Sequence, residues 1–415
     1  MKADKFKCGC AVVGGGAAGM MAALTAAGHG VNVILIEHTK RLGSKLLQTG
    51  NGKCNFTNLD MGKEHFQNED REFVGKVLES FQVSDTLEFF KEIGIYSRQR
   101  GGYVYPNSET AASLQDALRA EVERSGVIVY TECQVERIKR ERGGFVLETN
   151  QGRINADTLI LATGSKAAPK TGSDGSGYIL AKSLSHSIIK PLPALVQLTS
   201  DNRQCKVMAG VRSTGRVTIY ADGKKLAEDL GEIQYTEYGI SGIPVFQVSR
   251  YAVKAKDRKK EVLAVVDMLP EFSEEELRED IRKRLEKEEN KDIVSFFAGL
   301  LNKKLVQGVV KSVGADMNMT AGQAGEKKLY RLVREMKEYS FDITGSRSYE
   351  YAQVCQGGVK LSEVNPESME SRLCRGLYFA GELLDVDGKC GGYNLQWAWS
   401  SGYLAGKSAA EVCND

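Results

Sequence analysis

The sequence predicts an α/β protein, a Rossmann-like domain that is interrupted by an inserted β-barrel and a small helical subdomain. The N-terminus gives the first reason, because an apolar strand leads into Gly14-Gly-Gly-Ala-Ala-Gly19, an alanine-rich helix and a second strand that ends at Glu37. The second reason is that apolar runs typical of buried strands occur again at 157–164 and at 376–382. The third is a change after Pro193 to short alternating segments, followed by charged helical periodicity.

These patterns divide the chain into three parts, one of which is discontinuous. The hairpin signal Ala221-Asp-Gly223 lies in the insert, and Ser273-Glu-Glu-Glu276 is a capping-box start for the helices that follow. The predicted parts are a dinucleotide-binding domain formed by 1–190 and 355–415, a barrel-like insert formed by 191–270 and 336–354, and a helical subdomain over 271–335.

Composition and charge argue against several classes of protein. The 415 residues include 56 basic and 54 acidic side chains, and the net charge of +2 gives no electrostatic reason to expect a nucleic-acid or membrane partner. No apolar stretch approaches the ~20 residues of a membrane span. Nine scattered cysteines without a hydrophobic leader predict reduced thiols in a cytoplasmic protein, and four histidines without a ligand-spaced cluster predict no metal site. We expect a small-molecule substrate. The sequence does not determine the oligomeric state.

Each glycine of the first turn has a separate physical task. Gly14 permits the tight turn, Gly16 lets a pyrophosphate approach the backbone, and Gly19 lets the helix pack close to the strand. Glu37 ends the second strand, where a carboxylate accepts hydrogen bonds from both hydroxyls of an adenosine ribose and repels a 2′-phosphate. The turn therefore predicts FAD or NAD rather than NADP.

A strand, loop and helix near the C-terminus favour a flavin. The strand at 376–382 ends in Glu382, and Gly391-Gly-Tyr-Asn-Leu-Gln396 opens the last helix. A helix N-terminus carries about half a positive charge and unpaired N–H groups, so it would stabilise the negative charge of a reduced isoalloxazine. Glu382 or Asp387 is expected to bond the ribityl hydroxyls.

The long loop at 41–58 is predicted to clamp the cofactor. Gly50 and Gly52 allow close backbone approach, and Lys45 and Lys53 are expected to meet phosphate or flavin carbonyl groups.

Three further residues carry expectations of their own. Cys54, in the clamp loop, is expected to be a structural thiol. Cys390, just before the final helix, is the better candidate for a reactive thiol because a helix start lowers the pKa of a nearby thiol, but an unreactive thiol is favoured there as well. We expect His186 at a helix surface rather than as an acid–base group.

With these segments in view, the chain resembles the FAD-binding flavoproteins of the glutathione-reductase-like superfamily. Within that superfamily it is similar to the BaiN-like or aminoacetone-oxidase-like FAD/NAD(P)-dependent oxidoreductases, over essentially its whole length. The motifs that carry the resemblance are Lys45-Leu-Leu-x-x-Gly-x-Gly-x-Cys-Asn55-x-Thr57-Asn58, Thr163-Gly164, Gly357-Gly-Val359, and Gly376 to Gly388 followed by Gly391 to Gln396. One departure is Lys53, where relatives more often carry arginine, because lysine keeps the charge but loses the bidentate fork.

The resemblance implies a resident FAD, with the barrel and helical subdomain inserted between the two parts of its domain. It places the cofactor contacts in the first turn, the second strand end, the clamp loop, the backbone near Val135 and the C-terminal segments. The cofactor-binding residues so predicted are Gly14, Gly16, Ala17, Ala18, Gly19, Glu37, His38, Arg41, Lys45, Gly50, Asn51, Cys54, Asn55, Thr57, Val135, Thr163, Gly164, Gly381, Glu382, Asp387, Gly392, Tyr393, Asn394, Leu395 and Gln396.

Several functions fit these features. The chain has no second Gly-x-Gly-x-x-Gly after a strand, so NAD(P)H is expected to dock transiently as a co-substrate. The favoured hypothesis is an FAD-dependent oxidoreductase that reduces an activated C=C bond, in a steroid or bile-acid-like enone, with electrons from NAD(P)H. The alternatives are an FAD-dependent oxidase of small amines that uses oxygen, and a flavin-binding protein that is non-catalytic or serves tRNA modification.

No catalytic side chain is predicted, because the flavin itself performs hydride transfer. Several polar and aromatic residues lie in segments that could line a substrate site. Most of the tyrosines among them are expected simply to pack, with the hydroxyl group at the surface. These residues are Arg98, Tyr103, Tyr105, Tyr235, Tyr238 and Tyr351.

Overall fold

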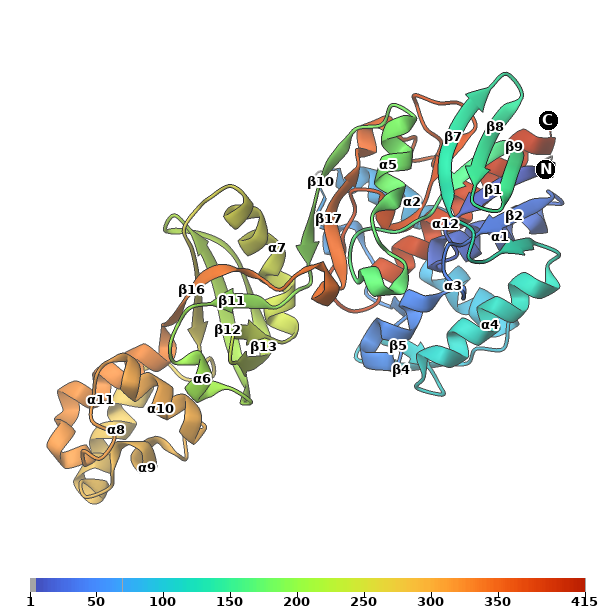
Figure 1. Cartoon of the computed structure of the whole chain (residues 1–415). Helices are drawn as coiled ribbons and strands as arrows, with labels where there is room; N and C mark the ends of the chain where they lie inside the picture. The colour runs from blue at the N-terminus through green and yellow to red at the C-terminus, as the bar shows by residue number, and fades with distance from the viewer. Residues whose placement is uncertain (1–4, 69, 415) are drawn as a thin grey trace. The chain divides into compact units, whose positions relative to one another are not determined.

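The computed structural model describes residues 5–68 and 70–414. The chain forms two compact units, one built from residues up to 192 and from 353 onward, the other from 193–352 (Figure 1). The helical segment expected at 271–335 belongs to the same compact unit as the barrel.

The first unit is built on a mixed sheet whose parallel strands end at one common edge. The strands are β1 (Lys5–Val13), β2 (Val33–Ile36), β6 (Ile128–Tyr130), β7 (Val135–Glu141), β8 (Gly144–Thr149), β9 (Gly152–Leu161) and β18 (Leu377–Phe379), in the order β6-β2-β1-β9-β8-β7, with β18 paired to β9. In register, Val13 lies opposite both Ile36 and Leu161, and Leu161 opposite Phe379. The residues that follow four separate strands therefore meet at the carboxyl edge of the sheet.

Small residues let two helices of this unit, α1 and α12, pack closely against each other. A Cβ atom on Gly402 or Gly406 of α12 (Tyr393–Asn414) would overlap the carbonyl oxygen of Ala18 or Ala22 in α1 (Ala17–Gly28). This close approach holds the start of α1 and the body of α12 together. Among the described residues, no helix is long and apolar enough to cross a membrane.

The other elements of this unit surround the sheet edge. The helices are α2 (Arg71–Ser80), α3 (Val83–Glu92), α4 (Ala111–Arg124) and α5 (Ser176–Ser183), and the short strands are β3 (Thr57–Asn58), β4 (Ser97–Arg100), β5 (Tyr103–Pro106), β10 (Ile188–Ala194) and β17 (Val354–Val359). The 3₁₀ turns are η1 (Ser44–Gly52), η2 (Lys63–His65), η3 (Pro169–Thr171), η5 (Leu361–Glu363) and η6 (Gly381–Leu383). β3, β5 and β4 form one small sheet, and β10 pairs with β17 in another.

The second unit contains a closed barrel with a helical cluster. The barrel strands are β11 (Leu198–Ser200), β14 (Gly239–Ser241), β13 (Lys224–Thr236), β12 (Arg212–Ala221), β15 (Val262–Asp267) and β16 (Tyr339–Ser346), in this spatial order, and the turn η4 (Tyr349–Tyr351) follows β16. The helices are α6 (Cys205–Met208), α7 (Ile243–Asp257), α8 (Glu274–Glu288), α9 (Ile293–Phe297), α10 (Lys303–Ser312) and α11 (Ala321–Lys337). The capping box expected at Ser273 is confirmed, and Lys337 at the end of α11 forms an ion pair of 2.8 Å with Asp267 of β15.

Candidate cofactor-binding site

The first glycine turn leaves a backbone cradle open at the start of α1. Gly14 has a φ of +106°, and a Cβ atom there would lie 2.5 Å from the carbonyl oxygen of Ala162. A Cβ atom on Gly19 would overlap the carbonyl oxygen of Gly14, whereas one on Gly16 would meet no described atom within 4 Å. The turn is therefore tightly packed on the inside and open over Gly16, at the point where the first N–H groups of a helix lack partners.

Glu37 is oriented by the same turn. Its carboxylate is buried, and its Oε2 and Oε1 atoms accept hydrogen bonds of 2.7 Å from the backbone N–H groups of Gly15 and Thr39, respectively. Each carboxylate oxygen keeps a further lone pair for another donor, such as a ribose hydroxyl. His38 lies beside it, with Nδ1 3.5 Å from Oε1.

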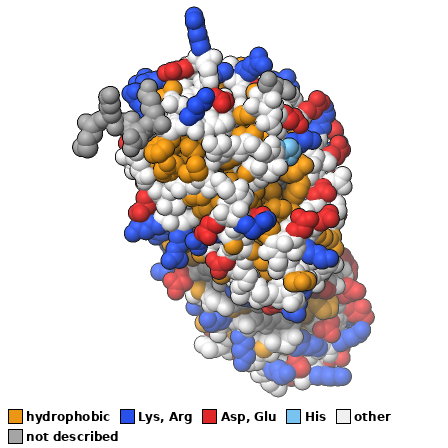
Figure 2. Space-filling view, turned by 90° about the vertical axis from the view of Figure 1, so that its right-hand side faces the viewer, with side chains coloured by type: hydrophobic (Ala, Val, Ile, Leu, Met, Phe, Trp, Pro, Cys, Tyr) orange, Lys and Arg blue, Asp and Glu red, His pale blue; other side chains and the backbone are white. Residues whose placement is uncertain are grey.

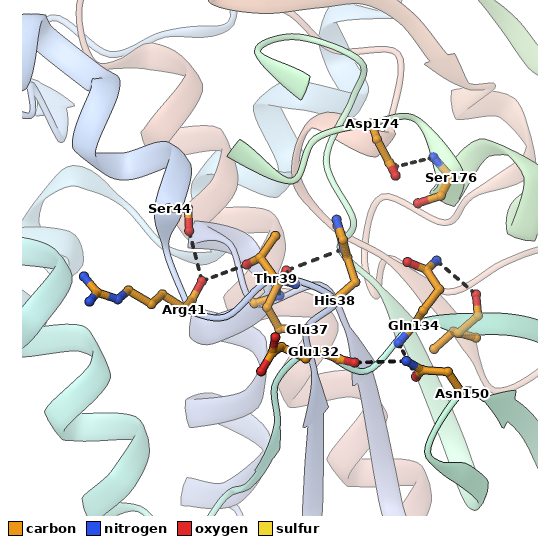
Figure 3. Close-up of polar contacts among 12 residues, drawn as sticks. Glu37, His38, Thr39, Arg41, Ser44, Glu132, Gln134, Asn150, Asp174 and Ser176 are labelled. Atoms are coloured by element: carbon orange, nitrogen blue, oxygen red, sulfur yellow. Dashed lines mark hydrogen bonds and ion pairs between the residues drawn. The ribbon is translucent and has the colours of Figure 1, made fainter. Parts of the chain in front are cut away.

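The segment that leads into β7 lies alongside the end of β2. The N–H groups of Cys133 and Glu132 donate to the carbonyl oxygens of Glu37 and Thr39. Gln134 donates from its side chain to the carbonyl oxygen of Val135, so this backbone is fixed next to Glu37. Figure 3 shows the Arg41 side chain pointing away from Gln134, and among the described residues only its carbonyl oxygen makes hydrogen bonds, with Thr39 and Ser44.

A second polar group forms where β9 and β18 end. Glu382 in η6 accepts a hydrogen bond of 2.6 Å from the Lys45 ammonium and one of 3.0 Å from the Ser165 hydroxyl, all on its Oε2 atom. The other carboxylate oxygen has no hydrogen bond to a described residue. A Cβ atom on Gly381 would lie 2.8 Å from the Ala18 Cβ atom, so this group adjoins the start of α1.

Thr163 adds a buried polar atom that lacks a partner. Its Oγ1 atom is inaccessible to solvent and makes no hydrogen bond with any described residue. The backbone of Thr163 lies against Gly14, because a Cβ atom on Gly14 would approach the Thr163 Cα atom to 2.8 Å. The Thr163 hydroxyl itself faces α5, because a Cβ atom on Gly177 would lie 1.7 Å from its Oγ1 atom.

The clamp loop has a left-handed backbone at its centre. Gly50, Asn51 and Gly52 have φ angles of +55°, +53° and +82°. The ammonium group of Lys53 lies 3.4 Å from the carboxylate of Glu109. The same carboxylate accepts from Arg98 and Arg100, so the charge of Lys53 is directed into this exposed ion cluster.

The start of α12 is fixed by amide side chains within the protein. Asn394 holds the loop before the helix, because its side chain accepts from the N–H of Gly388 and donates to the carbonyl oxygens of Gly388 and Lys389. The fully buried Gln396 accepts from Thr57 at 2.6 Å and from Thr86, and donates to Phe81 and Ser400. These contacts favour a structural role for Thr57, Asn394 and Gln396, which position Gly392 and its N–H for a ligand.

The remaining predicted contacts lie around these groups. The Asn55 side chain accepts from the N–H of Val104, and the Tyr393 ring stacks at 4.7 Å on His65. Asp387 is buried, Leu395 packs against the core, and Ala17 and Gly164 lie in the first turn of α1 and directly after Thr163.

One expectation about titratable groups is wrong, the one for His186, and the minority reading of Cys390 as a reactive thiol finds no support. Burial raises the pKa of the Cys390 thiol to about 11, because desolvation of the thiolate outweighs any help from the nearby helix start. His186 is buried rather than on a helix surface, and its Nε2 atom lies 2.8 Å from the Ser371 hydroxyl. The structural role expected for Cys54 agrees with its burial, which raises the pKa of the thiol to about 12. None of the nine cysteines forms a disulfide, and no group of three metal-ligating side chains occurs among the described residues.

These observations fit an extended dinucleotide. The open cradle over Gly16 and the spare acceptors of Glu37 and Glu382 lie along one sheet edge. FAD held there would place its adenosine at Glu37, its pyrophosphate at Gly16 and its ribityl chain at Glu382.

Comparison with known proteins decides the family. The model of the HI0933-like protein Rossmann domain matches residues 8–408. The chain belongs to the HI0933-like family. It is an FAD-dependent oxidoreductase, as the sequence predicted.

Two relatives of this HI0933-like protein differ in their reactions. It is 43% identical, over 402 residues, to the 3-dehydro-bile acid delta(4,6)-reductase of Clostridium scindens, with 96% of this chain and 98% of the relative covered. It is 30% identical, over 404 residues, to the ribosomal RNA dihydrouridine synthase of Haemophilus influenzae, with 96% and 97% covered.

Solved structures show the same fold. An Escherichia coli quinol fumarate reductase FrdA matches with a TM-score of 0.51 at 17% identity, over all of this chain and 71% of the other. The 3-ketosteroid delta1-dehydrogenase of Sterolibacterium denitrificans matches with a TM-score of 0.51 at 12% identity, over 98% and 100%. The Rossmann-type, FAD-binding fold class predicted from the sequence is confirmed.

The sequence analysis did not identify the residues that hold Glu37 and Glu382 in place through hydrogen bonds. Ser165 directly follows Thr163-Gly164, so its position after a strand end was a usable signal. The N–H groups of Gly15 and Thr39 that fix Glu37 leave no sequence signal, because any residue carries a backbone N–H.

Proposed function

We propose that this HI0933-like protein is an NAD(P)H-dependent reductase that saturates a C=C bond conjugated to a carbonyl group, in a small steroid-like acid. The observation that carries the proposal is the 43% identity to the bile-acid reductase, which extends over 96% of the chain. Bound FAD supplies hydride transfer at its N5 atom. The chain's own part is to hold the cofactor along the sheet edge, through Glu37, the Gly16 cradle and Glu382.

The hydride donor is proposed to bind only transiently. The other glycine-rich stretch, Gly172 to Gly177, runs from the end of η3 into the first turn of α5 and does not follow a strand, so it is no second dinucleotide turn. A donor without a resident site leaves after each hydride transfer and frees space for the substrate. The cytoplasmic location that the sequence predicts suits a supply of NAD(P)H.

A stopped-flow experiment under anaerobic conditions tests the proposal. NADH or NADPH should bleach the absorbance of the bound flavin, and a 3-dehydro-bile acid with Δ4 and Δ6 double bonds should restore it. Failure of the enone to reoxidise the reduced flavin would contradict the proposal. Peroxide release upon addition of a small amine in air would instead favour the amine oxidase.

Ribosomal RNA is the second candidate substrate, because of the 30% identity to a ribosomal RNA dihydrouridine synthase. The chemistry is related, since the C5=C6 bond of uracil is also conjugated to a carbonyl group. The charge distribution favours the small acid, because basic and acidic side chains number 56 and 54, and they are interspersed on the face that Figure 2 presents. Incubation of reduced enzyme with ribosomal RNA, followed by analysis for dihydrouridine, distinguishes the two.

A further inference from the structure

Three cations of the first unit share a single carboxylate. Arg98 and Arg100 belong to β4, and Lys53 belongs to the clamp loop. All three form ion pairs with Glu109, at 3.0 Å for Arg98 and at 3.4 Å for Lys53. Within residues 5–68 and 70–414, none of these four side chains forms another ion pair. Three positive charges around one negative charge leave the cluster with a positive excess.

The cations of this cluster are open to solvent, whereas the carboxylate lies among them. The side chains of Lys53, Arg98 and Arg100 are 46%, 48% and 55% exposed, and that of Glu109 is 27% exposed. The hydrogen bond from Arg98 and the charges of the other two cations lower the pKa of the Glu109 carboxyl group, so it stays ionised at neutral pH. The backbone of Glu109 has a φ of +55°, which side chains other than Asn and Asp seldom adopt. A ligand can therefore reach the cations that Glu109 gathers.

The hairpin that carries the two arginines also touches the predicted flavin site. Arg98 and Arg100 project from the same face of β4, because they are two residues apart in a strand. Their partners across the hairpin, on that face, are Tyr105 and Tyr103 of β5. A Cβ atom on Gly391, which lies just before α12, would approach the Tyr103 ring to 2.4 Å. The cluster and the start of α12 are thus linked through one hairpin of the first unit.

The ligand chemistry that suits this cluster is a phosphate monoester. Such a group carries a charge of about −1.5 to −2 at pH 7 and three strong acceptor oxygens, so it matches both the excess charge and the number of cations. Guanidinium groups bind phosphate through paired N–H donors, and an ammonium group adds a point charge. Among the reactants of the proposed function, NADPH carries a phosphate monoester, on the 2′ oxygen of its adenosine ribose, and NADH does not.

We propose that Lys53, Arg98 and Arg100 bind the 2′-phosphate of NADPH and make NADPH the preferred hydride donor. This inference rests on the proposed function, which includes a nicotinamide donor that binds transiently. The 2′-phosphate lies at the opposite end of NADPH from the nicotinamide, so its binding group is expected on a hairpin beside the flavin site rather than within it. The Glu109 carboxylate holds the three cations together before the donor arrives. Because the phosphate competes with this carboxylate, the donor binds reversibly.

The test compares two nucleotides that differ only by the 2′-phosphate. The probes are adenosine 2′,5′-bisphosphate and 5′-AMP, and isothermal titration calorimetry gives the Kd of each for the FAD-loaded enzyme. The wild type should bind the bisphosphate at least about tenfold more tightly at low ionic strength, and added salt should reduce this preference. Arg98→Gln and Arg100→Gln should each remove most of the preference, whereas Glu109→Gln should increase it. The control is Arg124→Gln, at the far end of α4 in an exposed ion pair with Glu121, and it should leave the preference unchanged.

Opposite effects of the arginine and glutamate variants distinguish binding from damage to the fold, because damage would weaken binding of both nucleotides. Equal Kd values in the wild type, or no binding of either nucleotide, overturn the inference. A preference that survives in Arg98→Gln and Arg100→Gln overturns it, and so does a smaller preference in Glu109→Gln. If the arginine variants do not fold, Lys53→Gln in the exposed part of the clamp loop provides the same comparison.

A second measurement separates this inference from the proposed function. In anaerobic stopped-flow experiments, NADPH should reduce the flavin with a lower apparent Kd than NADH, and Arg98→Gln should bring the two values together. If the enone does not reoxidise enzyme that NADPH has reduced, the proposed function fails while the nucleotide preference still tests the inference. Weaker binding of a ribosomal RNA fragment to Arg98→Gln, with an unchanged preference between the nucleotides, assigns the cluster to RNA and overturns the inference.

Discussion

At the scale of single residues, Glu37 shows how a side chain can be prepared for a ligand before the ligand arrives. Both carboxylate oxygens are already held by backbone N–H groups, of Gly15 and of Thr39. Charge-assisted bonds of this kind fix the carboxylate in one orientation, and the spare lone pairs point to the remaining donors. The side chain therefore links the glycine turn to the adenosine end of the predicted FAD site.

Substitution of Glu37 by glutamine should weaken FAD binding about ten- to a hundredfold. The amide has one acceptor oxygen instead of two, and its NH₂ group would face one of the two backbone donors. Fluorescence titration of apoprotein with FAD measures the change. Glu141→Gln is the matched control, because Glu141 is an exposed acid at the end of β7 in the same unit. Unchanged FAD affinity in Glu37→Gln would rule out the assigned role.

His186 gives the first unit a pH-dependent stability. Burial lowers the pKa of its imidazole in the folded state, so between the ordinary value of about 6.5 and the lowered value the unfolded chain binds more protons. The free energy of unfolding should therefore fall as the pH drops from 7.5 to 5.5. Urea unfolding at both pH values should show a smaller fall for His186→Asn than for the wild type. An equal fall in both proteins would contradict this assignment.

At the scale of elements, the glycine turn separates a packing role from a binding role. A Cβ atom on Gly16 meets no described atom within 4 Å, and the backbone there has a φ of −79°, which alanine adopts freely. Gly16→Ala should therefore change the free energy of unfolding of the apoprotein by about 1 kcal/mol or less, while FAD affinity falls at least about tenfold.

Gly19→Ala should behave in the opposite way. The added methyl group would overlap the carbonyl oxygen of Gly14, so the apoprotein should lose about 1–3 kcal/mol or more. Chemical unfolding of both apoproteins and FAD titration of both measure the two effects. Similar stability losses in Gly16→Ala and Gly19→Ala would show that the open cradle does not exist.

Elements that depend on local pattern could be predicted from the sequence, and those that depend on distant partners could not. The strand, glycine turn and helix at the N-terminus follow from periodicity and glycine spacing over a few residues. The closure of the barrel requires Leu198 to pair with Ser346, which no local pattern reveals. For the same reason, the sequence placed Gln396 among the cofactor contacts, whereas its partners Thr57 and Phe81 lie more than 300 residues away.

At the scale of the whole molecule, the predicted cofactor site belongs to one of the two compact units. The residues assigned to the cofactor all lie in the first unit. The hydrophobic core that includes β1, α1 and α12 is formed by residues of the first unit alone. Binding of FAD should therefore not require the second unit.

Excision of the second unit tests this separation. β10 pairs with β17, and the backbone of Lys190 lies against Gly357, so a short Gly-Ser linker should join Ala194 to Ala352 with little strain. The shortened protein should unfold cooperatively and bind one FAD per chain, because the core and the cradle are both retained. Absorbance spectroscopy and calorimetry provide the readouts, and Gly16→Ala in the shortened protein controls for nonspecific flavin binding. Loss of both FAD binding and cooperative unfolding would show that the first unit depends on the second.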